Sequence, residues 1–206
     1  MTLLDNLDQS VQREIANSQK RLEFQDIENI WYYFLTLESD MLETSQYIDP
    51  NGQENTYSFA FYKIILLSCC EIESVFKVIC ELLEGKSGGN IGEYKQIFLK
   101  HMPRICEAFV IVPRWKGRVV EPFAEWKTGK LSWWDVYSQI KHTRAWRFEN
   151  ATYKTAVLAL SALYLLIQYL YQLHGYECKA DDSRYFDSDY FHRPIYGKYY
   201  TPLPCK

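Results

Sequence analysis

The stretch Ala156–Tyr171, AVLALSALYLLIQYLY, decides the fold of this chain. Only Ser161 and Gln168 interrupt its apolar character. The stretch is shorter than the ~20 apolar residues that span a bilayer, so we expect a buried core helix and no membrane span. That helix should cover about residues 150–174, because it starts on an asparagine, which is a good N-cap, and Gly175 follows it as a stop.

Two apolar runs upstream also have helical spacing. The first begins at Asp26 and ends in the turn Asp49–Gly52, and the second covers about Ser58–Leu83. Shorter helices are predicted over Glu93–His101 and Ser132–His142. The second long run places its apolar residues on one stripe, as expected for a helix with one buried face: Phe61, Ile65, Cys69, Ile72, Phe76, Ile79 and Leu83.

One stretch, Ala108–Trp126, favours strand instead of helix. Residues 109–112 and 119–120 have high β-propensity, and Lys116-Gly117 is a suitable turn between them. Two prolines within the stretch limit it to a short hairpin. The predicted fold class is therefore all-α with a short β-hairpin excursion.

Composition predicts one domain over residues 1–206. The chain is 48% hydrophobic and 24% charged, which is the balance of an ordinary globular protein. Within it we expect a peripheral N-terminal segment at residues 1–25 and an irregular C-terminal tail at residues 176–206. The aromatic content of 17% is high, and excess aromatic residues either enlarge a core or form an interface, so a homodimer is one of the two interpretations. Because the net charge is −3, any contact with nucleic acid must use a local basic patch.

The cysteine, histidine and N-terminal patterns indicate a cytoplasmic protein without a bound cofactor. Residues 1–21 lack the apolar core of a signal peptide, and the six cysteines show no CxxC spacing. Reduced thiols in a cytoplasm are the expected state. The four histidines have no metal-ligand spacing, so no metal site is predicted, and no dinucleotide or Walker motif predicts a cofactor.

The segment Trp133–Arg144, WWDVYSQIKHTR, has the side chains best suited to chemistry. On a helix it would bury its aromatic and aliphatic residues and expose a polar row that ends in His142. Lys141, Arg144 and Arg147 are close by in the sequence. Histidine can transfer a proton near neutral pH, and lysine or arginine can neutralise a phosphate. The simpler interpretation is a solvated helix face near a helix end, where cations suit the local dipole.

The stretch Trp133–Leu170 resembles the C-terminal half of prokaryotic HEPN-type (higher eukaryote and prokaryote nucleotide-binding) helical proteins. The resemblance rests on the aromatic pair, the Lys141-His142-x-Arg144 sequence and the long apolar helix, and the Phe59–Leu83 helix fits the same bundle. It implies an antiparallel helical bundle of four to five main helices and a homodimer with paired active sites. It also implies metal-independent cleavage of RNA in a toxin or phage-defence system, where an antitoxin or another protein is a partner.

Under this resemblance His142 would act as the acid or base. We assign Arg144 and Lys141 to stabilising charge on the phosphorus. Single-stranded RNA is the expected substrate, because its unpaired bases can stack on aromatic rings. The side chains expected to hold the RNA are Arg147, Trp133, Trp134 and Trp146.

One departure from the family motif leaves other functions open. Members usually place an arginine four to six residues before the histidine, whereas here Val136, Tyr137 and Ser138 occupy those positions. A non-catalytic dimeric module that binds a protein, a nucleotide or RNA is therefore an alternative. A bundle that holds a nucleotide or another phosphate ligand is a further one.

Overall fold

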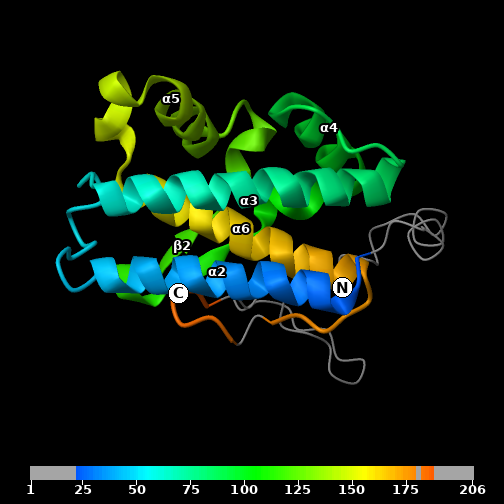
Figure 1. The fold of residues 1–206 in the computed structure, drawn as a ribbon, viewed down its shortest axis with the longest axis horizontal. Helices are drawn as coiled ribbons and strands as arrows, with labels where there is room; N and C mark the ends of the chain where they lie inside the picture. The colour runs from blue at the N-terminus through cyan, green and yellow to red at the C-terminus, as the bar shows by residue number, and fades with distance from the viewer. Residues whose placement is uncertain (1–21, 180–181, 188–206) are drawn as a thin grey trace.

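A computed structural model of the chain describes residues 22–179 and 182–187, apart from the side chains of residues 144–146. The described residues form five α-helices and a two-stranded sheet, joined by short 3-10 turns (Figure 1). The α-helices are α2 (Phe24–Thr44), α3 (Phe59–Glu84), α4 (Ile91–His101), α5 (Ser132–Arg147) and α6 (Tyr153–Leu173). The predicted all-α bundle with a short hairpin is confirmed.

Helix α6 lies at the centre of the core. Every residue from Ala159 to Tyr171 is buried, and Figure 1 shows the helix behind α2 and α3. Among the described residues, α6 is the one helix that is long and apolar enough to cross a membrane by length and composition. Of its most apolar stretch, 89% is buried within the protein. The predicted N-cap was wrong. Residues 148–150 form a separate 3-10 turn, η5, and the hydroxyl of Thr152 caps α6 by accepting from the Thr155 amide at 3.2 Å.

Helices α3 and α6 begin at the same end of the molecule and run in the same direction, with α2 antiparallel to both (Figure 1). An isolated β-bridge between Tyr57 and Thr152 joins their starting points. Ser58 caps α3 by accepting from the Phe61 amide, and Gly85 ends it in the left-handed conformation with a φ of +70°. The chain between these helices, residues 85–152, therefore brings α6 back to the start of α3.

That returning stretch contains the predicted hairpin. Strand β1 (Val110–Val112) pairs antiparallel with β2 (Arg118–Val120), and Lys116 and Gly117 make the turn with positive φ. The 3-10 turns before, within and after the hairpin are η2 (Pro103–Glu107), η3 (Pro113–Trp115) and η4 (Ala124–Lys127). The last of these turns, η4, ends shortly before α5 begins.

The described part of the C-terminal segment lies against α2 and β1. Tyr185 and Phe186 are buried, and Ile111 forms a backbone bridge with Asp187. The Glu38 carboxylate, fully buried on α2, accepts hydrogen bonds from the Ser183 hydroxyl and from two backbone amides that follow it. The remaining parts of the predicted N-terminal segment and tail, residues 1–21, 180–181 and 188–206, lie outside the described residues.

Candidate functional site

Helix α5 is anchored along one face and exposed along the other. Trp133, Tyr137 and Ile140 are buried, and the indole Nε1 of Trp133 donates to the carbonyl of Pro122 at 2.7 Å. These three positions share a face because they are spaced by four and three residues. The opposite side of the helix therefore faces away from the core. His142 is exposed on that side, as the sequence predicted.

The helix is kinked directly after His142. Thr143 has φ −136° and ψ 39°, which is outside the helical region, and its hydroxyl donates to the carbonyl of Gln139 at 2.8 Å. A threonine hydroxyl that bonds back to the preceding turn is a known way to bend a helix. Beyond the kink the chain turns into η5, where the Asn150 amide nitrogen donates to the side chain of Gln139 at 3.2 Å. Residues 148–150 are thus held beside the turn of α5 that precedes His142.

Lys141 is exposed, but its amine is positioned by the buried face. Its Nζ donates to the hydroxyl of Tyr137 at 3.1 Å and lies 5.1 Å from the centre of that ring. The same hydroxyl contacts Sγ of Cys70, an exposed thiol on α3, at 3.7 Å. Burial raises the pKa of the Tyr137 phenol, and the hydrogen bond with Cys70 raises it further. The phenol therefore stays protonated near neutral pH and holds the ammonium as a neutral acceptor.

His142 and Lys141 point in different directions. Successive helix residues do not face each other, so Lys141 lies over Tyr137 toward α3 while His142 continues the outer row formed with Asp135 and Ser138. Among the side chains that the structure describes, none forms a hydrogen bond with the imidazole of His142. A second group acting with this imidazole must therefore come from an undescribed side chain, from a ligand or from another chain.

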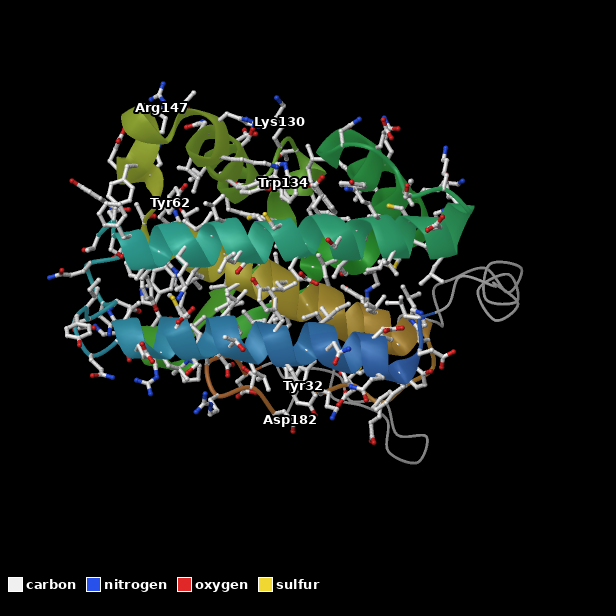
Figure 2. All side chains as sticks on the ribbon, in the orientation of Figure 1. Tyr32, Tyr62, Lys130, Trp134, Arg147 and Asp182 are labelled. Carbon is white, nitrogen blue, oxygen red and sulfur yellow. The ribbon has the colours of Figure 1, made fainter. Side chains whose placement is uncertain are left out.

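The predicted RNA-binding residues have different environments. Arg147 is exposed at the outer edge of α5 (Figure 2). Trp134 is half-buried against Phe76 and Tyr137, with ring centroids 6.0 and 5.1 Å away, so much of its ring surface is covered. The side chains of Arg144 and Trp146 lie outside the described part of the structure.

The expectation that bases stack on Trp133 is wrong. Its side chain is 1% exposed and its Nε1 bonds to Pro122, so no face of the ring is open to a ligand. The physical reason is its position: Trp133 begins the buried stripe of α5 and packs against Phe123, at a ring distance of 6.2 Å. The helical spacing of Trp133, Tyr137 and Ile140 already placed the Trp133 ring on the apolar face, which conflicts with a stacking role.

Two features of this region were missed in the sequence. Tyr137 was predicted only as a core residue, although its hydroxyl also positions Lys141. Exposed aromatic rings at the start of α3 were not identified, although Phe59 lies off the apolar stripe that begins at Phe61, which is a signal that could have found it. Among the described residues no group of three or more His, Cys, Asp or Glu side chains could hold a metal ion.

Comparison with known proteins gives no assignment: no family model, curated protein or solved structure matches this chain.

Proposed function

We propose that the protein binds single-stranded RNA and cleaves it without a metal, in the manner of HEPN-type ribonucleases of toxin or phage-defence systems. The observation that carries the proposal is that α5 presents two suitable groups to solvent at successive residues, whose side chains point in different directions. The imidazole of His142 is exposed, and the ammonium of Lys141 is held at 3.1 Å by the Tyr137 hydroxyl. Proton transfer and neutralisation of phosphate charge are the two tasks of metal-free RNA cleavage.

The charge around α5 supports a polyanionic substrate. Residues 141–154 contain two lysines, two arginines and one glutamate, which gives this segment a formal charge of +3 in a chain whose net charge is −3. Local cations of this kind attract the phosphate backbone even when the whole protein is acidic. Arg144 and Arg147 belong to this segment, and we assign both to contacts with phosphate.

The proposed reaction needs one proton acceptor and one proton donor. A neutral imidazole of His142 removes the proton from a ribose 2′-hydroxyl, whose oxygen then bonds to the adjacent phosphorus. The bond from phosphorus to the 5′-oxygen of the next nucleotide breaks, and that oxygen takes a proton from an imidazolium. The products are a 2′,3′-cyclic phosphate and a 5′-hydroxyl. In a homodimer the second imidazole would come from His142 of the other copy.

The reaction class is tested with purified protein and a labelled single-stranded RNA in excess chelator. The proposal predicts fragments that end in a cyclic phosphate, and no cleavage of a matching strand with 2′-deoxyriboses, which lacks the nucleophile. Expression in a bacterial host should slow growth if the protein is a toxin. Intact RNA together with harmless expression would contradict the proposal.

A non-catalytic dimeric module is the second candidate. It is favoured by the missing upstream arginine and by the absence of a described hydrogen-bond partner for the imidazole of His142. Sedimentation at micromolar concentration separates the possibilities together with the RNA assay. A species of about twice the 24.5 kDa chain mass without cleavage favours the module, whereas a monomer alone contradicts it and also contradicts a composite active site.

A further inference from the structure

Four aromatic rings meet where α3 begins and α5 ends, and we call them the Phe148 cluster. The Phe148 ring lies 4.5 Å from that of Phe59, 5.7 Å from that of Tyr57 and 6.1 Å from that of Tyr62, measured between centroids. The rest of the protein does not enclose these rings. The side chain of Phe59 is 66% exposed and that of Tyr57 is 52% exposed, and both rank among the most exposed large apolar groups of the described residues.

The backbone beneath these rings is braced. The Ser58 amide donates to the carbonyl of Ala151 at 3.3 Å, and the Tyr153 amide donates to the carbonyl of Thr56 at 2.9 Å. Together with the Tyr57–Thr152 bridge these bonds fix residues 56–58 against residues 151–153. Phe148 is placed by η5, which the Asn150–Gln139 hydrogen bond holds to α5. The exposed rings are therefore preorganised.

The cluster lies within the positively charged part of the chain. Phe148 belongs to residues 141–154, whose formal charge is +3, and Arg147, the residue before it, is exposed. Figure 2 shows Arg147 and Tyr62 at the same end of the molecule. The η5 turn that carries Phe148 is bonded to Gln139, which precedes His142 by three residues and so lies on the same side of α5.

From this combination we infer that the Phe148 cluster is a stacking site for the bases of single-stranded RNA. Proteins commonly hold single strands with exposed aromatic rings that lie beside cationic side chains. The bases stack on the rings, because every base has a π-face, and the cations neutralise the phosphates. Phe59 and Tyr57 offer the open rings, while Phe148 and Tyr62, both half-buried, support them. The strand would then pass from these rings toward His142.

The inference rests on the proposed function for its ligand, single-stranded RNA, but it does not require cleavage. Base stacking is thereby assigned to rings that are exposed to solvent, in place of the buried Trp133. The alternative is that a second copy of this chain covers the Phe148 cluster.

The test measures binding of a short fluorescein-labelled single strand with 2′-O-methyl riboses, which cannot be cleaved, by fluorescence anisotropy. We expect Phe59→Ala to weaken binding by about 5- to 150-fold, the range for one lost base stack, and Phe59→Tyr to bind as the wild type does. The matched control is Tyr32→Ala, an aromatic side chain that is 57% exposed on α2, which should leave the affinity unchanged. Because Phe59 is mostly exposed, its replacement should not unfold the protein, and a melting curve checks this.

Three results would overturn the inference. The first is a wild type that does not bind the strand, which would also remove the substrate of the proposed function. The second is Phe59→Ala binding as tightly as the wild type while ordinary RNA is still cleaved, which leaves the proposed function standing. The third is loss of self-association in Phe59→Ala without a change in RNA affinity, which assigns the rings to a second copy. Ring-dependent binding without cleavage of ordinary RNA would support the stacking site and contradict the ribonuclease.

Discussion

The hydroxyl of Tyr137 shows how a buried residue can control an exposed one. Its ring is part of the buried face of α5, and its oxygen accepts from the ammonium of Lys141 at 3.1 Å. Lysine side chains otherwise sample many rotamers, and ordering one costs free energy. In the proposed function this ordering is done before RNA arrives, so Lys141 is positioned by Tyr137.

Tyr137→Phe tests this positioning without changing the shape of the core. We expect the free energy of unfolding to fall by no more than about 1.5 kcal/mol, the value of one hydrogen bond. RNA binding and cleavage should fall several-fold, and their dependence on salt should change little because Lys141 is still charged. Urea titration and an RNA assay at several salt concentrations measure these effects. An unchanged RNA affinity would show that the hydrogen bond has only a structural role.

Glu84 gives a residue-scale prediction for pH. Its carboxylate accepts from the Lys100 ammonium at 2.7 Å and from His101 Nε2 at 3.1 Å. These two bonds, that of Lys100 first, lower the pKa of the Glu84 carboxyl from 4.5 to about 2. Because the folded pKa is below the unfolded one, the stabilisation is fully present above pH 4.5 and is lost as the pH falls toward 2.

Glu84→Gln should therefore lower the free energy of unfolding at pH 7 and make little difference near pH 2. Lys100 is 66% exposed and solvent screens the pair, so we expect a loss of about 0.5–1 kcal/mol. Urea titrations across this pH range measure it, with Glu121→Gln at an exposed position as the control. A loss that is equal at both ends of the range would rule out the ionic interaction as its cause.

At the scale of elements, α6 determines the fold because other elements surround it. Leu163 is 0% exposed in the middle of that helix. Leu163→Ala removes buried methyl groups and leaves a cavity, so it should cost roughly 2–5 kcal/mol. Chemical denaturation measures the cost, and Lys154→Ala on the exposed side of the same helix should stay within about 0.5 kcal/mol. A loss as small as that of the control would place α6 outside the core.

The C-terminal segment is the second element-scale case, because it is fixed to α2 through one carboxylate. Oε1 of Glu38 accepts from the amides of Arg184 and Tyr185, both at 3.1 Å, and from the Ser183 hydroxyl. Glu38→Ala would remove the acceptor of the Ser183 hydroxyl and the Arg184 amide, and one of the two acceptors of the buried Tyr185 amide. We expect a loss of about 1.5–3 kcal/mol, typical of hydrogen bonds to a charged group. Hydrogen exchange should speed up at residues 183–187 in particular, and uniform exchange across the whole chain would contradict a local fastening role.

At the scale of the whole molecule, the sequence predicts the elements better than the surfaces they form. The 3.6-residue periodicity of the long apolar runs locates α2, α3 and α6, because each buries one face or all faces. The start of α6 was placed at Asn150 instead of Thr152, because asparagine and threonine are both good N-caps, whereas Asn150 is the last residue of η5. Local patterns cannot distinguish these two caps.

The candidate site was predicted in part for the same physical reason. The exposure of His142 follows from the buried stripe on its own helix, which is visible in the sequence. The Phe148 cluster joins rings from two segments about ninety residues apart, and backbone hydrogen bonds between residues 56–58 and 151–153 bring them together. The partners that cover Trp133, Phe123 and Pro122, also come from another segment. Contacts of this kind are set by the fold and leave no periodic signal.

The central claim is that His142 transfers protons in metal-independent RNA cleavage, and one comparison tests it most directly. Single-turnover cleavage of one labelled single-stranded RNA is measured in excess chelator for wild type and for His142→Ala, prepared side by side. Because the side chain is exposed, the melting temperature should be unchanged, while the rate should fall by about 10²–10⁴-fold. Equal rates for the two proteins, or no cleavage by the wild type, would contradict the claim.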